Sequence, residues 1–151
     1  MLHSTSKRQR LQSTLLAVSL LGMAGLAACA GATSAPPAAV ALVGTEWQLQ
    51  SINGRPVMDG SQASLQFPEA GRVAGNGSCN RFVGAVAIDV ERIVFRQVAS
   101  TRMACLGGAG EQEMRYMDAL QKAQRYEVLD RQLTIQVQGM EQPLLFKKTK
   151  P

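Results

Sequence analysis

The chain has 151 residues and a formal net charge of +5 at pH 7, and loss of an N-terminal leader with three basic residues would lower the charge to about +2. What remains allows one ordinary domain with one core and excludes a second. The basic residues after the leader are scattered among acids along the sequence, so we do not expect the basic stripe that binds nucleic acid.

The first 28 residues have the three zones of a secretory signal. A basic stretch at Lys7–Arg10 precedes an apolar run at Leu15–Leu26, and the small residues Ala27 and Ala28 follow. The apolar run is too short for a permanent transmembrane helix, which needs about 20 residues. We therefore expect residues 1–28 to be a signal peptide that is removed.

The sequence Leu26-Ala27-Ala28-Cys29 resembles the lipobox of bacterial lipoproteins, in which the cysteine receives diacylglycerol. The resemblance implies that Cys29 is lipidated and that its freed amine is acylated, and two or more chains hold a protein firmly at a membrane. Ala30 stands where an Asp commonly marks retention in the inner membrane, so we expect anchoring in the outer membrane, facing the periplasm.

The expected organisation after the leader has three parts. Residues 29–43 hold the lipidated cysteine and an uncharged linker rich in Ala, Pro and Gly. Residues 44–148 form the domain, and residues 149–151 are a short tail. The basic cluster at the tail, Lys147, Lys148 and Lys150, is either solvated or makes a weak contact with anionic head groups.

From Gly44 onward, apolar residues alternate with a period of two, which predicts short β-strands. The turn signals between them include Asn53-Gly54, the strongest short hairpin signal. The expected strands lie around Trp47–Ser51, Leu65–Phe67, Val86–Val90, Ile93–Phe95, Leu133–Val137 and Leu144–Phe146. Six or more short strands indicate an antiparallel sheet or a small barrel.

One segment has helical spacing instead. Between residues 110 and 125, Met114, Met117 and Leu120 recur every three or four residues, which predicts one amphipathic helix. We expect its methionines to pack against the sheet. An adaptable binding face is the alternative for this methionine-rich stripe.

Cysteine and histidine usage limits the possible chemistry. With Cys29 lipidated, Cys79 and Cys105 remain, and in an oxidising compartment two such residues most simply pair. Closing a loop of about 27 residues would stabilise the fold by roughly 3 to 4 kcal/mol in the chain-entropy model. The alternative is a redox-active or metal-binding pair, although neither cysteine has a partner at CxxC spacing.

The only histidine, His3, lies in the leader, so the mature protein would have no imidazole for a catalytic triad or a histidine zinc site. We expect no catalytic residue, no metal and no cofactor.

Two glycine-rich stretches, residues 75–77 and 107–110, are expected to be turns, because neither is followed by the Lys-Ser/Thr of a phosphate loop. Glu111 and Glu113 would also repel an anion at the start of the helix. Three further acids are expected to be solvated on exposed faces: Asp89, Glu91 and Asp118.

The run Ser78-Cys79-Asn80-Arg81-Phe82-Val83-Gly84, followed by Thr101-Arg102-Met103-Ala104-Cys105, resembles the META domain of HslJ-type lipoproteins. That family has a Gly-Cys-Asn-x-Phe-x-Gly run near its start and a Thr-x-Met-Ala-Cys run in its middle. The matching motif residues outside the cysteines are Asn80, Phe82, Gly84, Thr101, Met103 and Ala104. Ser78 replaces the family's glycine, and Val86 replaces its usual aromatic.

The resemblance implies an α+β fold, in which a small antiparallel sheet, curled toward a barrel, packs with one amphipathic helix. It also implies a role in heat shock, envelope stress and antibiotic tolerance without an established reaction. We therefore expect a monomeric, non-catalytic lipoprotein that binds an envelope protein. Three alternatives stay open: a module for an apolar ligand, an inhibitor of a secreted hydrolase, and a secretion-pilot lipoprotein that binds a peptide tail.

Overall fold

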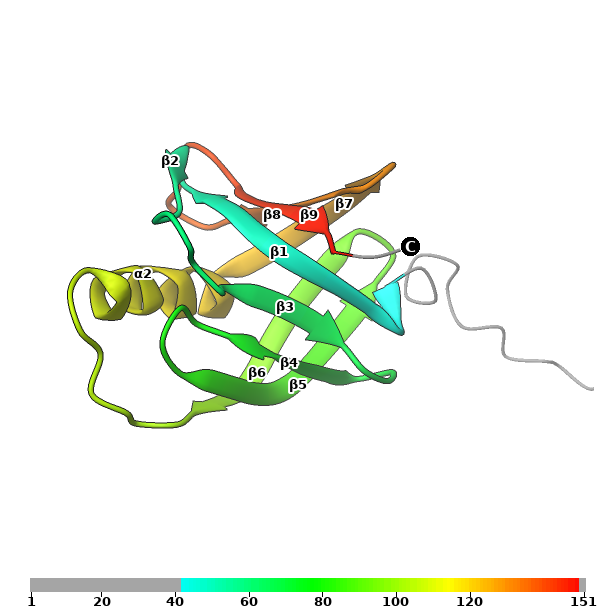
Figure 1. Cartoon of the computed structure of the whole chain (residues 1–151). Helices are drawn as coiled ribbons and strands as arrows, with labels where there is room; N and C mark the ends of the chain where they lie inside the picture. Colours follow the sequence, from blue (N-terminus) through cyan, green and yellow to red (C-terminus); the bar gives the residue numbers. More distant parts are fainter. Residues whose placement is uncertain (1–41, 150–151) are drawn as a thin grey trace, which may run out of the picture. The chain divides into compact units, whose positions relative to one another are not determined.

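The computed structural model describes residues 42–149, which form one α-helix and nine β-strands (Figure 1). In chain order these are β1 (Thr45–Ile52), β2 (Arg55–Pro56), β3 (Ser64–Phe67), β4 (Arg72–Asn76), β5 (Arg81–Asp89), β6 (Arg92–Ser100), α2 (Ala109–Gln121), β7 (Ala123–Leu129), β8 (Gln132–Val137) and β9 (Leu144–Lys148). Within these residues, no helix has both the length and the apolar character that a membrane crossing requires. The expected signal peptide, lipidation site and most of the linker lie outside the described residues.

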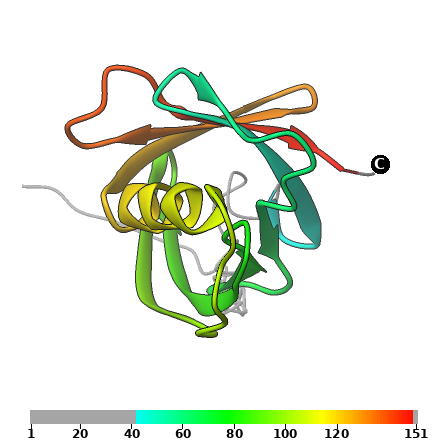
Figure 2. The ribbon, with the colours of Figure 1, turned by 60° about the vertical axis from the view of Figure 1, so that its left-hand side comes forward.

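The strands form one antiparallel sheet that closes on itself. The order is β2-β1-β3-β4-β5-β6-β7-β8-β9, and β1 also pairs with β9. Strands β6 and β7 are joined at one residue pair, Arg92 opposite Arg125, and helix α2 connects them along the chain. Figure 2 shows α2 lying across one opening of the barrel. The expected α+β class, with a curled sheet and one helix, is confirmed.

The inward side chains of the strands and of α2 form one apolar core. The largest fully buried side chains include Trp47, Phe67, Phe82, Tyr116 and Phe146. Tyr116 comes from the helix, its ring packs edge-on against Phe82 at 6.1 Å, and its hydroxyl donates to the Ser64 carbonyl oxygen at 3.2 Å. Burial raises the pKa of Tyr116 well above its ordinary value. The inside of the barrel is therefore filled by side chains, which stabilise the fold by leaving water.

Strands occur at all six expected positions, and three others were not expected. Strand β2 is only two residues long, β4 has a single fully buried apolar residue, Val73, and β7 begins inside the segment predicted to be helical. Val90 was predicted to lie in a strand, which is wrong. It occupies the two-residue turn between β5 and β6 with a φ of 51°.

The helix ends earlier than its pattern predicted and turns a different face inward. Its last residue is Gln121, because Ala123 enters the core as the first residue of β7. Met117 packs partly against the core, but Met114 is 67% exposed, so its predicted packing against the sheet is wrong. The buried face is formed by Gln112, Tyr116, Ala119 and Leu120. A large aromatic side chain and hydrogen bonds of Gln112 thus decided the rotation of the helix.

The first glycine-rich stretch is not simply a turn. Gly75 and Asn76 belong to β4, and a Cβ at Gly75 would collide with the Ser64 carbonyl oxygen and lie 2.6 Å from the Phe82 ring. In the second stretch, Gly107 does lie in a turn with a φ of 59°, whereas Ala109 and Gly110 begin the helix. Close packing, in addition to turn geometry, therefore explains why glycine occurs here.

Candidate functional site

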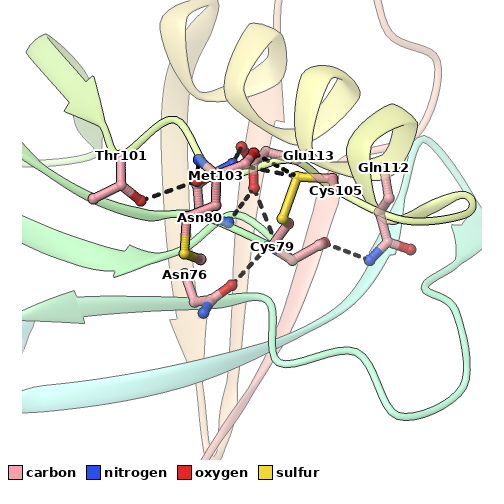
Figure 3. The surroundings of a disulfide bond; sticks show 9 residues. Asn76, Cys79, Asn80, Thr101, Met103, Cys105, Gln112 and Glu113 are labelled. Atoms are coloured by element: carbon pink, nitrogen blue, oxygen red, sulfur yellow. Dashed lines mark hydrogen bonds between the residues drawn. A yellow bond between two sulfur atoms is a disulfide. The ribbon is translucent and has the colours of Figure 1, made fainter.

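The two family motifs meet at a disulfide near the start of helix α2 (Figure 3). Cys79 and Cys105 are bonded, with their Cα atoms 5.9 Å apart, within the usual range for a disulfide. The bond joins the turn between β4 and β5 to residues 101–108, which we call the disulfide loop. The two sulfurs and a Glu113 oxygen lie within 4.8 Å of one another. Because the sulfurs are bonded, they are not available as thiolate ligands or nucleophiles.

The carboxylate of Glu113 is the polar centre of this site. Its Oε2 accepts hydrogen bonds from the backbone N–H groups of Cys79 at 3.1 Å and Asn80 at 2.6 Å. Its Oε1 accepts a hydrogen bond from Asn80 Nδ2 at 2.8 Å. Hydrogen bonds to a charged acceptor are roughly twice as strong as neutral ones. Glu113 therefore fixes the turn between β4 and β5 to the helix.

The buried side chain of Asn80 extends this connection to the disulfide loop. Its Oδ1 accepts hydrogen bonds from the Thr101 hydroxyl at 3.0 Å and from the Met103 N–H at 2.7 Å. Its Nδ2 donates to Glu113 and also lies 3.3 Å from Cys105 Sγ. One amide thus connects its own turn to two other segments, the disulfide loop and helix α2. An apolar residue of the same size would leave these polar groups without partners.

Two small residues let the turn approach the helix. A Cβ at Gly77 would lie 2.7 to 2.9 Å from atoms of the Glu113 side chain, so a larger residue would displace the carboxylate from its hydrogen bonds. Ser78 has a φ of 130°, a backbone conformation that favours glycine. Its N–H donates to Asn76 Oδ1, and its hydroxyl accepts a hydrogen bond from Gln112 Nε2 at 2.7 Å. This chain therefore has a strained serine, with a new hydrogen bond, in place of the family's glycine.

A second buried amide, Gln112, holds the start of the helix from another side. Its Nε2 also donates to the Ser61 hydroxyl at 2.8 Å, and its Oε1 accepts from the Met58 N–H at 2.7 Å. The loop between β2 and β3 is thereby attached to α2. Gln112 and Glu113 together place the first turns of the helix against two loops.

Some of the remaining motif residues are packed inside the barrel, and others are exposed. Phe82 lies in the core, and a Cβ at Gly84 would lie 3.1 Å from the backbone of β6. By contrast, Met103 is 60% exposed and Leu106 is 88% exposed, although the backbone of the loop is fixed at Met103 and Cys105. The site can therefore present apolar side chains on a constrained loop. Its buried polar groups satisfy one another.

The family motifs include Asn80 and Thr101, which the structure places together, but they do not include the hydrogen-bonding partners on the helix. The sequence pattern indicates Glu113 only as an acid near a helix terminus and gives no reason to single out Gln112. The signal was weak, because both lie 32 or more residues from Asn80 and no local pattern links them. The acids predicted to be solvated, Asp89, Glu91 and Asp118, are exposed, and Asp118 accepts a hydrogen bond from Lys122.

Comparisons with known proteins give the family and the fold of the chain. The family model for the META domain matches residues 40–150. One solved NMR structure is 27% identical, with a TM-score of 0.60, and the match covers 72% of this chain and 92% of that one. An NMR structure of a protein from Burkholderia xenovorans is 24% identical, with a TM-score of 0.63 and coverages of 76% and 88%.

A more distant match shows how far the fold extends. The crystal structure of a DUF4847 family protein from Bacteroides vulgatus is 12% identical, with a TM-score of 0.59 and coverages of 76% and 99%. At this identity the similarity concerns the fold alone. No curated protein sequence matches the chain at a significant level.

The role of Glu113 can be tested by removing its charge. We expect Glu113→Gln to lower the free energy of unfolding by about 2 to 3 kcal/mol, because an amide nitrogen would face N–H donors and a charged acceptor is lost. Glu111→Gln is the matched control, since Glu111 is exposed and lies 3.9 Å from Arg115. Urea unfolding of the disulfide-bonded protein measures both, and equal stabilities would contradict the assignment.

The strain at Ser78 can be separated from its hydrogen bond by two substitutions. Ser78→Ala and Ser78→Gly both remove the hydroxyl that Gln112 contacts. Only glycine adopts the positive φ without cost, so we expect the glycine variant to be more stable than the alanine variant by about 1 kcal/mol. Thermal unfolding of the pair measures this difference. An alanine variant as stable as the glycine variant would show that the turn is not strained.

Proposed function

The chain belongs to the META domain family, and from this premise we propose that it is a non-catalytic lipoprotein of the bacterial envelope that binds a protein partner through the disulfide loop. The proposal places it among proteins of heat-shock and envelope-stress responses, anchored in the outer membrane through Cys29. The observation that carries it is the exposure of Met103 and Leu106 on a loop with a fixed backbone.

A constrained loop lowers the cost of binding. When a flexible loop binds, part of the binding free energy is lost in ordering its backbone and side chains. Here the disulfide and the Asn80 hydrogen bonds have already fixed residues on either side of Ala104. Exposed Leu106 and the adaptable side chain of Met103 can then supply apolar contact area to a partner.

The filled interior favours a protein partner over an apolar ligand inside the sheet. The inward positions of the barrel are occupied by buried side chains, among them Trp47, Phe67 and Phe146. An internal ligand would have to displace them. A secreted hydrolase is a specific candidate for the partner, because an inhibitor of such an enzyme would present a rigid exposed loop. The alternative of a secretion pilot also involves protein binding, but along a sheet edge.

A role without catalysis is supported by the chemistry of the site. The polar groups around the disulfide are paired with one another: Glu113 with Asn80 and Cys79, and Gln112 with Ser78. They stabilise the loop and leave no nucleophile with an adjacent base. The single histidine of the sequence lies in the expected leader. A catalytic triad or a thiol-imidazole pair therefore has no imidazole in the mature chain.

The anchor can be tested through the mass of the exported protein. We expect the membrane-bound form to lack residues 1–28, to carry a diacylglyceryl group and one further acyl chain on Cys29, and to have lost two hydrogens through the Cys79–Cys105 bond. Intact mass spectrometry of protein extracted from membranes checks all three. A soluble periplasmic form without acyl groups would refute the anchor and leave the loop hypothesis untouched.

The loop can be tested by photo-crosslinking in intact cells. A photoreactive residue at position 106 is expected to give a discrete adduct with one envelope protein, which mass spectrometry then identifies. Leu129 is the matched control, because it is a 64% exposed leucine on β7. We expect Leu106→Asp to weaken binding of the purified partner at least tenfold, and Leu129→Asp to leave it unchanged. Equal labelling from both positions would contradict the proposal.

A further inference from the structure

The outer side of strands β4, β5 and β6 gathers arginines that are far apart in the sequence. Arg72 on β4 and Arg96 on β6 both lie directly opposite Ala85, which is on β5 between them. Arg81 lies on the same side of β5, because it precedes Ala85 by four residues and side chains of a strand alternate between its two sides. We call this surface the arginine face, formed by Arg72, Ala74, Arg81, Val83, Ala85, Arg96 and Ala99.

Basic residues outnumber acids on this face, and the nearest acids lie at its borders: Glu46, which lines one hollow with Ala74 and Arg81, Asp89 at the end of β5, and Glu69 before β4. Residues 70–88 and 92–110 contain arginines but no aspartate or glutamate. Arg72 lies 3.5 Å from Glu69, which precedes β4, and both side chains are exposed. Within residues 42–149, neither Arg81 nor Arg96 forms an ion pair. Two exposed guanidinium groups are therefore free to bind an anion, and a third has only a weak surface partner.

Between the arginines the face has small or apolar side chains. Ala74, Ala85 and Ala99 are small, and Val83 at the centre is 56% exposed. The guanidinium groups extend further than these side chains, and guanidinium matches phosphate oxygens through paired hydrogen bonds. The face has no exposed aromatic residue of the kind that anchors a protein interface. Its exposed arginines and small apolar side chains therefore favour phosphate groups over a protein partner as the ligand.

The chain enters the domain beside this face. Leu42 and Val43, the first described residues, line a small cavity of about 250 Å³ together with Gly71 and Val86. Gly71 directly precedes Arg72. An anchor at Cys29 would be joined to this point by residues 30–41, which can span roughly 20 to 40 Å. The tether would therefore hold the rim of the arginine face within reach of the lipid head groups.

We propose that the arginine face binds the phosphate groups of anionic phospholipids, so that the outer side of β4–β6 lies on the membrane. This goes beyond the proposed function, since it uses no residue of the disulfide loop, and only the tether step rests on the proposed anchor at Cys29. Attraction to an anionic surface is set by the number of basic residues that reach it and weakens with salt. Exposed Val83 adds apolar contact at the interface.

The test measures vesicle binding without the anchor. The mature chain, residues 29–151, is produced without its leader and with Cys29→Ser, and its disulfide is verified by mass. Cosedimentation compares vesicles of pure phosphatidylcholine with vesicles that also contain phosphatidylglycerol. We expect binding only to the anionic vesicles. Each arginine is expected to contribute about fivefold to affinity, so the triple variant Arg72→Gln, Arg81→Gln, Arg96→Gln should lose about a hundredfold.

A control variant separates the face from net charge. Arg55→Gln, Arg115→Gln and Arg131→Gln together remove the same charge from exposed positions elsewhere, and we expect a loss of no more than about threefold. Leu106→Asp should bind vesicles nearly as the unsubstituted chain does, which keeps this result independent of the loop. Equal losses from the two triple variants would overturn the proposal. So would equal binding to neutral vesicles, or binding of the face to an acidic envelope protein but to no vesicle.

Discussion

The hydrogen bonds between the Glu113 carboxylate and the turn at Cys79 and Asn80 are the constraint on which the rest of the site depends. They hold helix α2 against a turn of the barrel, and through Asn80 they fix the backbone of the disulfide loop. The close approach requires glycine at position 77. The Glu113 carboxylate, the Asn80 amide and the Cys79–Cys105 disulfide are neighbours of one another. Loss of one of them would therefore leave polar groups of the others buried without a hydrogen-bonding partner.

Because the barrel is closed and its inside is filled, its outer surface is the part that can bind partners. Strand β1 pairs with β9, α2 lies across one opening, and aromatic side chains fill the inside (Figures 1 and 2). The two surfaces proposed to bind partners differ in chemistry. The disulfide loop offers exposed apolar side chains, whereas the arginine face offers exposed guanidinium groups. A tethered protein with two such surfaces could contact a membrane and a protein at the same time.

Strand positions were predictable from the sequence where apolar and polar residues alternate over several positions. The apolar residues of β1, β8 and β9 alternate cleanly, and the sheet buries those residues. Strand β4 gave no such signal, because Gly75 and Asn76 resemble a turn and become a strand only when the Ser64 backbone and the Phe82 ring pack against them. The helix was predicted, but its rotation was not. Met114 and Tyr116 are both plausible core residues, and only packing against Phe82 decides between them.

The sequence by itself determined the leader pattern, most of the strands, the helical segment and the two cysteines that could pair. These features are local, because they follow from composition, periodicity or short spacing. The α+β class and the motif residues around the cysteines followed from the resemblance to the META family. Only the tertiary structure decided that Glu113 and Gln112 would satisfy the motif residues, and that arginines scattered along the chain would share one face. Both outcomes depend on strand register and helix rotation, which bring together residues with no relation in sequence.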